Sequence, residues 1–239
     1  MAVGQRLKLA AAAARHVQVL RLRPGAALTL FDGRGAEWPA RLLALDRSAV
    51  EVLVLGQESI ERELTRPVTL APGMPANDRM DALIEKATEL GAAAIVPLEC
   101  ERSVLRLAGE RAERRAAHWR AVAIAACEQC GRNLVPAIAT PQTLSKALGE
   151  RPAAAMALQL SLAPDAMPAA EVLAGLDPRR ALWIFSGPEG GFTPAEQTAL
   201  AAAGAVAVSL GSRVLRADTA PLAMLALLAL GDAPPGVRR

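Results

Sequence analysis

The pattern of hydrophobic and polar positions changes near residue 63. Beyond it, short apolar runs alternate with segments in which apolar residues recur at helical spacing, as Met80, Leu83, Ile84 and Ala87 do. The pattern predicts strands at residues 68–71, 94–97, 134–138, 154–160, 182–185 and 206–209, and helices at residues 79–91, 110–130, 169–176, 194–203 and 220–230. This alternation is typical of an α/β fold with a parallel sheet.

The first 63 residues follow another pattern. A helical stretch at residues 10–20 precedes strand candidates at residues 26–31, 38–45 and 49–55, and glycines mark a hairpin at residues 32–35. Short strands joined by tight turns predict a small β-barrel. A charged connector, residues 56–66, then places the domain boundary near Glu63, with domains at residues 1–63 and 64–239.

Charge and composition favour contacts with phosphate groups and argue against a membrane-spanning or disulfide-linked protein, but they do not indicate a particular activity. The net charge is +3, but residues 1–41 hold seven Lys or Arg and two acids, so this stretch is suited to phosphate contacts. The basic candidates there include Arg6, Arg21, Arg23 and Arg34. The longest apolar run, residues 220–230, is shorter than the roughly 20 residues of a membrane span. We therefore expect a cytoplasmic protein, and three cysteines argue against a disulfide framework.

Cys127 and Cys130 form a C-x-x-C pair, which is compatible with zinc or redox chemistry. No second pair accompanies them, and His118 belongs to the same predicted helix. The spacing of Trp119 and Ala123 favours a packed helix face, so the thiols are interpreted as structural.

Two glycine-marked loops hold the candidate chemistry. The first, GPEGG at residues 187–191, follows a predicted strand and leads to a helix start with Thr193 as N-cap, Pro194 at the first helical position and Glu196 completing a capping box. It matches neither the P-loop nor the dinucleotide fingerprint, so a tight turn remains an alternative. The second loop, residues 210–218, follows the next strand. Loops at the ends of neighbouring strands form one ligand crevice.

Together the two loops resemble the SPOUT class of methyltransferases, and within it the bacterial family that methylates uracil N3 in 16S ribosomal RNA. The second loop reads LGSRVLRADTA, where the family pattern carries Thr-Glu at the positions of Ala217 and Asp218. Further resemblance lies in HVQVLRLRPG (residues 16–25), RMDALIEKATELG (79–91), ERSV (101–104) and EQCGR (128–132). It therefore covers nearly the whole chain, although the start lacks the family's aromatic-rich first strand.

The resemblance implies a C-terminal SPOUT domain with a deep trefoil knot, an N-terminal PUA-like RNA-binding barrel and a homodimer built on the helices at residues 79–91 and 220–230. It implies S-adenosylmethionine as cofactor, S-adenosylhomocysteine as product, no metal, and 16S rRNA, free or within the small subunit, as partner. The expected cofactor shell is Leu160, Ser161, Gly187, Glu189, Gly190, Gly191, Leu210, Gly211, Ser212, Val214 and Leu215.

Removal of the N3 proton needs a base or a cation that stabilises the uracil anion. The catalytic candidates are Arg213, Arg216 and Asp218, with Asp218 as a possible base and the arginines as the cations; the alternative is that the three pair with one another and hold the loop shut. Arg102, Glu128, Gln129 and Arg132 are added as candidate substrate contacts. Two other functions stay open: ribose 2′-O-methylation on the same fold, and RNA binding without catalysis.

Overall fold

The computed structural model describes residues 1–46, 49–76 and 79–231. The pattern of contacts divides the chain into two compact units, Met1–Arg62 and Glu63–Arg239. The last residues of the predicted second domain, 232–239, lie outside the described residues.

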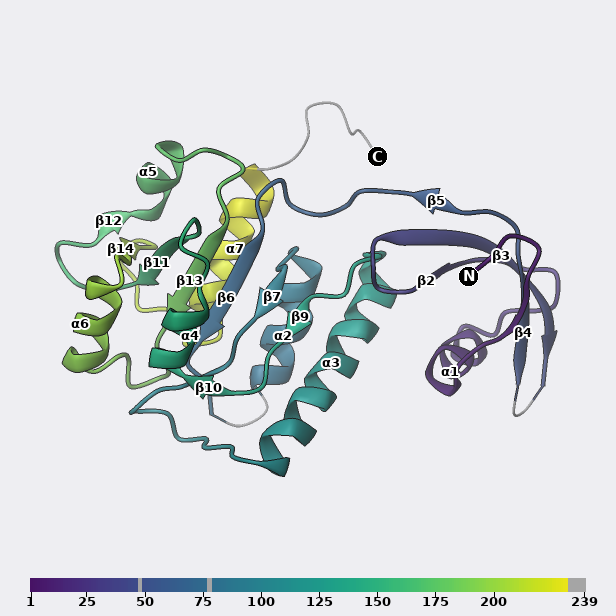
Figure 1. Cartoon of the computed structure of the whole chain (residues 1–239), viewed down its shortest axis with the longest axis horizontal. Helices are drawn as coiled ribbons and strands as arrows, with labels where there is room; N and C mark the ends of the chain where they lie inside the picture. The colour runs from purple at the N-terminus through teal and green to yellow at the C-terminus, as the bar shows by residue number, and fades with distance from the viewer. Residues whose placement is uncertain (47–48, 77–78, 232–239) are drawn as a thin grey trace. The chain divides into compact units, whose positions relative to one another are not determined.

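The first unit is an antiparallel sheet with one helix packed on it (Figure 1). The strands pair in the order β1-β4-β3-β2, and β5 adds to β3. Ala14 and Val17 of the helix are buried with Leu42, Val50 and Val52 of the sheet, which gives this unit its own core. Its elements are β1 (Arg6–Lys8), α1 (Ala11–Val19), β2 (Ala27–Phe31), β3 (Ala36–Leu45), β4 (Val50–Val54) and β5 (Glu58–Ser59).

The strand β1 is one of the short elements that sequence patterning missed. It pairs antiparallel with β4 through Arg6, Leu7 and Lys8 and is only three residues long. Leu7 packs against the core of the unit, while Arg6 and Lys8 are exposed on either side of it. Three residues are too few for alternation to stand out from its surroundings.

The second unit is built on a parallel sheet. Within the described residues it has seven strands in the order β12-β14-β11-β13-β6-β7-β9, every neighbouring pair parallel. The strands are β6 (Val68–Pro72), β7 (Ala94–Ile95), β9 (Ala137–Ile138), β11 (Met156–Leu160), β12 (Met167–Pro168), β13 (Leu182–Ser186) and β14 (Val206–Ser209), and a separate parallel pair joins β8 (Leu98–Glu99) to β10 (Gln142–Thr143).

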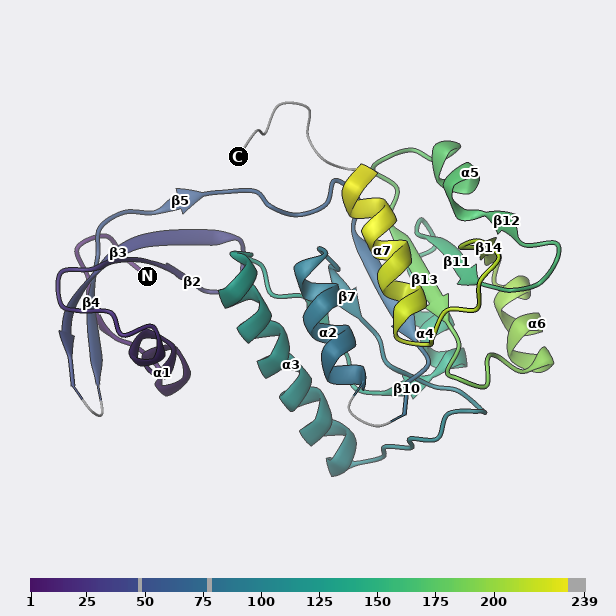
Figure 2. The same ribbon diagram turned by 180° about the vertical axis from the view of Figure 1, so that it is seen from behind.

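Helices cover both faces of this sheet (Figure 1; Figure 2). Helices α2 (Arg79–Glu89), α3 (Glu110–Cys130) and α7 (Thr219–Gly231) lie on one face, and α4 (Leu144–Glu150) and α6 (Pro194–Ala202) lie on the other. The short helix α5 (Ala169–Ala174) follows β12. Successive strand residues serve opposite faces: Ile184 joins the core under α2 and α7, and Phe185 joins the core under α4 and α6. This is why the strands read as continuous apolar runs.

The predicted capping box at the start of α6 is present. Thr193 Oγ1 accepts from Glu196 N at 3.3 Å, and Glu196 Oε2 accepts from Thr193 N at 2.8 Å, with Pro194 at the first helical position. The chain then passes from α6 to β14, beyond β11 in the sheet, and returns as α7 to pack against β13 and β6. The predicted knot requires a return crossing of this kind.

Candidate functional site

A cavity of about 700 Å³ lies at the carboxyl ends of β14, β11 and β13, which are neighbours in the sheet. The loop after each strand supplies part of its wall: residues 160–163 after β11, 186–192 from the end of β13, and residues of 210–217 after β14. Its size falls within the range of small-molecule and cofactor sites. The two glycine loops predicted to share a crevice therefore do meet.

The glycine loop after β13 is tied down on both sides. A Cβ added to Gly187 would lie 2.8 Å from Phe192 N, so the loop folds back on its own backbone. Glu189 Oε1 accepts from Ala76 N at 3.0 Å, and Arg102 Nη1 donates to Gly190 O at 2.7 Å. Glu189, predicted as part of the cofactor shell, thus also fastens the loop to the segment after β6.

The loop that carries Arg102 is itself fixed to α6. Glu196 accepts with its second carboxylate oxygen, Oε1, from Glu101 N at 2.8 Å. A Cβ added to Gly190 would meet the Arg102 side chain at 3.1 Å, so Arg102 lies directly against the glycine loop. The wall of the cavity is therefore a set of backbone segments cross-linked by side chains.

The cavity offers hydrogen-bonding groups that the protein itself leaves unused. Ser186 is 2% exposed, lines the cavity, and its Oγ has no hydrogen-bond partner among the described residues. In the described part of the chain, the N–H groups of residues 213–216 donate to no other backbone group. Leu160, Phe192, Leu210 and Leu215 supply apolar wall. The site therefore fits a flat, largely apolar ligand with polar edges.

Four arginines line the cavity: Arg79, Arg102, Arg213 and Arg216. Arg213 and Arg216 are exposed. Neither forms an ion pair with any residue that the structure describes. The alternative in which they pair with Asp218 is therefore wrong, because Asp218 faces Arg79 at 4.0 Å. Asp218 and Ser212 are the predicted site residues of these loops that do not line the cavity.

Arg79 is the charged cavity residue that sequence reasoning overlooked, and Ser186 is an uncharged one. Arg79 is the first residue of α2, which reads as an amphipathic helix and gives no local sign of a site. Arg79 opens the motif RMDALIEKATELG, and its place in that motif was the one available signal. Its position beside Asp218 depends on the fold, which brings α2 and α7 together.

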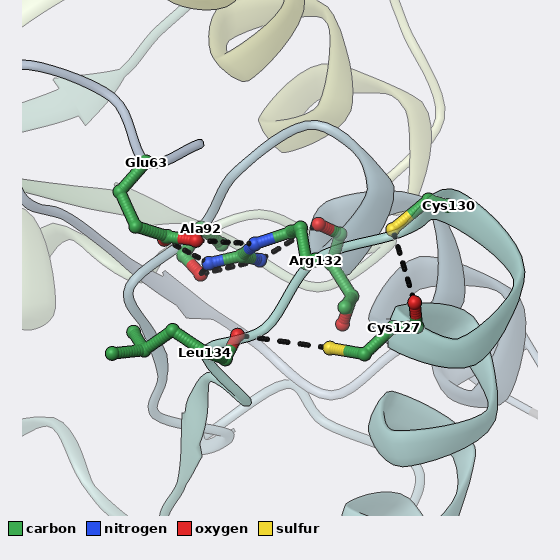
Figure 3. Close-up of polar contacts among 7 residues, drawn as sticks. Glu63, Ala92, Cys127, Cys130, Arg132 and Leu134 are labelled. Carbon is green, nitrogen blue, oxygen red and sulfur yellow. Dashed lines mark hydrogen bonds and ion pairs between the residues drawn. The ribbon is translucent and has the colours of Figure 1, made fainter. Parts of the chain in front are cut away.

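The arginine predictions outside the cavity divide into two kinds. Arg6, Arg21, Arg23 and Arg34 are exposed in the first unit, where RNA contact stays a prediction. Arg132, by contrast, is 5% exposed and lies inside the second unit. Figure 3 shows its guanidinium against Glu63 and Ala92: Nε donates to Glu63 Oε1 at 2.9 Å, Nη2 pairs with Glu63 Oε2, and Nη1 donates to Thr88 O at 2.7 Å. Its burial does not suit a phosphate contact, so we replace that prediction with a structural role.

The C-x-x-C pair beside Arg132 also has structural partners (Figure 3). Cys127 Sγ lies 3.6 Å from Leu134 O, and Cys130 Sγ lies 4.0 Å from Cys127 O. Burial raises the pKa of Cys127 to about 11, so its thiol stays protonated at neutral pH. Among the described residues, no three His, Cys, Asp or Glu side chains gather as metal ligands. The packing interpretation of the pair agrees with these contacts.

Comparison with known proteins identifies the family to which the chain belongs. Residues 62–229 match the family described as RNA methyltransferase domain, and residues 9–55 match the RNA methyltransferase PUA domain. The chain belongs to the RNA methyltransferase family. The two matches fall in the two units of this RNA methyltransferase and account for a SPOUT-type parallel sheet preceded by a PUA-like domain.

Several relatives of this RNA methyltransferase are similar along most of their length. Ribosomal RNA small subunit methyltransferase E from Bacillus subtilis is 32% identical, over 89% of this chain and 84% of its own. The crystal structure of the enzyme of that name from Neisseria gonorrhoeae, bound to S-adenosyl methionine, is 36% identical with a TM-score of 0.87, covering 96% of this chain and 93% of its own. A putative methyltransferase from Legionella pneumophila with bound cofactor is 31% identical with a TM-score of 0.89, covering 97% and 94%.

No helix among the described residues of this RNA methyltransferase has the length and apolar character that crossing a membrane requires.

The structural role of Arg132 can be tested with Arg132→Met. The change removes the buried guanidinium that pairs with the Glu63 carboxylate, 20% exposed, and donates to the carbonyl of Thr88. We expect the free energy of unfolding in urea to fall by about 3 kcal/mol, the lower end of the loss for a broken buried pair.

Arg114→Met is the matched control, because Arg114 forms an exposed pair with Glu110 on α3 and should lose less than about 0.5 kcal/mol. If Arg132→Met unfolds at the same urea concentration as this control yet binds RNA poorly, the structural assignment is wrong.

Proposed function

We propose that this protein transfers a methyl group from S-adenosylmethionine to N3 of a uracil in the 16S ribosomal RNA of the small subunit. The observation that carries the proposal is the cavity at the ends of β14, β11 and β13, where glycine loops, unused hydrogen-bonding groups and four arginines meet. Relatives that share this fold at more than 30% identity are named as small-subunit rRNA methyltransferases, and one of them holds S-adenosyl methionine. Both cofactor and substrate class follow from that likeness.

The cofactor would lie against the three strand-end loops. The backbone of residues 210–215 and the hydroxyl of Ser186 would meet its polar edges, and Leu160, Leu210 and Leu215 would pack on its adenine ring. When bound, the cofactor supplies an electrophilic methyl group on a sulfonium sulfur. The chain's task is then to hold the uracil ring with N3 in line with that methyl group and to keep water out.

Methylation at N3 is favoured by positive charge near the uracil ring. Neutral uracil carries a proton on N3, and loss of that proton spreads negative charge onto the two ring oxygens. Arginine side chains in the cavity stabilise this charge more strongly as it develops than they stabilise the neutral ring, which lowers the barrier. Arg213 and Arg216 are suited to this role or to holding the neighbouring phosphate, because no protein acid neutralises them within the described residues.

We assign the remaining RNA contacts to the first unit and the place of action to the cytoplasm. Its exposed arginines and its match to an RNA methyltransferase PUA domain support RNA binding. We also propose a homodimer through α7 and α2: α7 contains no charged residue, and its Leu230 is 82% exposed. Light scattering of the purified protein measures that state directly.

The function is tested by incubating 16S rRNA, and separately isolated small subunits, with the protein and S-adenosylmethionine. Nuclease digestion and mass spectrometry of the nucleosides should then show N3-methyluridine. A ribose-methylated product would replace the proposal with 2′-O-methylation. Calorimetry that detects no S-adenosylmethionine binding, with no product, would instead leave an RNA-binding protein without catalysis.

Among the arginines of the first unit, Arg21 has an unusual backbone conformation, with a positive φ angle. The helix α1 ends with Arg21 N donating to Gln18 O and Leu22 N donating to Val17 O, which places Arg21 in the left-handed region at φ 53°. The helix α6 ends in the same way, but there Gly204 holds that position at φ 76°. A residue with a Cβ is disfavoured in this conformation by about 1–2 kcal/mol. Strain of this kind gathers at functional positions.

Arg21→Gly should therefore separate stability from RNA binding. We expect the free energy of unfolding to stay constant or rise by up to about 1 kcal/mol, because relief of strain outweighs the added flexibility of the unfolded chain. Binding to 16S rRNA should weaken, and its dependence on log salt should lose about one unit of slope.

Arg15→Gly, within the same helix, is the control and should lower stability by about 1 kcal/mol. Unchanged RNA affinity and salt slope in Arg21→Gly would remove Arg21 from the RNA-binding surface.

A further inference from the structure

Arg79 and Asp218 form a pair at the edge of the cavity that the predicted catalytic set did not include. Arg79 begins α2, and Asp218 stands immediately before α7. Arg79 Nη1 lies 4.0 Å from Asp218 Oδ1, within ion-pair distance but longer than a hydrogen bond. Asp218 Oδ1 is buried and accepts no hydrogen bond from the described residues. Arg79 is thus the charged group that faces this oxygen.

The two partners differ in their access to the cavity. Arg79 lines it and Asp218 does not. A general base must come within hydrogen-bond reach of the proton that it removes, and Asp218 does not line the cavity in which a ligand would lie. The arrangement therefore favours Arg79 as the group that meets the substrate.

The other charged groups of the wall have different restraints. Arg102 Nη1 is held by Gly190 O, and Glu189 Oε1 accepts from Ala76 N. Arg213 and Arg216 extend from an exposed loop with no ion pair in the described chain. Arg79, in contrast, projects from the first residue of a helix that packs against α7, and an acid at the start of α7 faces its guanidinium. A group mounted on packed helices is held more accurately than one on a loop.

We infer that Arg79 is a catalytic residue that stabilises the anionic uracil in the cavity, and that Asp218 is a positioning residue that orients the Arg79 guanidinium. This inference rests on the proposed function. The N3 proton leaves to solvent water, the electron pair it leaves behind attacks the methyl carbon, and the sulfonium sulfur departs as a neutral thioether. Arg79 donates hydrogen bonds to the ring oxygen on which the charge builds.

The test is a double-mutant cycle with Arg79→Gln, Asp218→Asn and the double variant. The single-turnover rate of methyl transfer to 16S rRNA is measured across pH, together with S-adenosylmethionine affinity by calorimetry and thermal unfolding. Arg79→Gln should slow transfer by about 10²–10³-fold, the effect of removing one donor to a developing oxyanion. Cofactor affinity should not change, because neither side chain is assigned to the cofactor.

The pair should also behave as a unit. Asp218→Asn should slow transfer less than Arg79→Gln does, and the double variant should be no slower than Arg79→Gln alone, since Asp218 acts only through Arg79. Arg79→Lys should recover part of the rate because it keeps the charge. The rate in Asp218→Asn should keep the wild-type pH profile. Arg114→Gln and Glu110→Gln provide the same substitutions in an exposed arginine–acid pair on α3.

Three results would overturn the inference. The first is a folded Arg79→Gln enzyme with normal transfer. The second is an Asp218→Asn enzyme slower than Arg79→Gln and recovering as pH rises, which would make Asp218 the base. The third is additive losses that follow the folded fraction, which would make the pair a structural tie between α2 and α7. If Arg79→Gln does not fold, the inference is tested with the other two variants. The transfer rate of Arg79→Lys should lie below that of the wild type, and the pH profile of Asp218→Asn should match that of the wild type. The wild-type nucleoside product tests the proposed function separately.

Discussion

In the second unit, the backbone after β6 lies directly against the backbone after β13, with no side chain between them. This contact sets the geometry of the glycine loop. A Cβ at Gly73, just after β6, would lie 2.5 Å from Pro188 N, just after the neighbouring strand β13. Gly73 N donates to Ser186 O at 2.7 Å across this contact. The glycine loop is thereby pressed against the end of β6, where Glu189 reaches Ala76 N. The glycine loop, which forms part of the wall of the cavity, is therefore fixed where it leaves β13.

The cavity is basic mainly because few acidic side chains line it, and not because it contains many basic ones. Glu189 is the acid on the wall, and one of its oxygens accepts a backbone N–H; Asp218 does not line the cavity and lies 4.0 Å from Arg79. Four arginines line the cavity in which, under the proposed function, a uracil and its phosphate would lie. An environment of this kind stabilises an anion as it forms and costs no reorganisation when it does. It also explains how a protein with a net charge of only +3 can present a strongly basic site.

Sequence reasoning succeeded where the signal is local. The capping box at Thr193 and the span of α3 are both encoded in neighbouring residues, and both appear in the structure as predicted. It failed where the answer depends on distant segments. Arg132 follows a helix end and reads as an exposed substrate contact, but Glu63, from a segment 69 residues away in sequence, neutralises it inside the protein. Arg79 reads as an ordinary helical charge until α7 brings Asp218 to it.

The carboxylate of Glu196 joins two segments that are otherwise separate. One oxygen caps α6 through Thr193 N, and the other holds Glu101 N in the loop that carries Arg102. If the two segments separated, at least one of the two hydrogen bonds that the Glu196 carboxylate accepts would break. The start of α6 and the loop after β8 are therefore coupled through one side chain, and that loop also carries Arg102, which donates to the glycine loop. A change that removes this carboxylate would therefore loosen the helix cap and the wall of the cavity together.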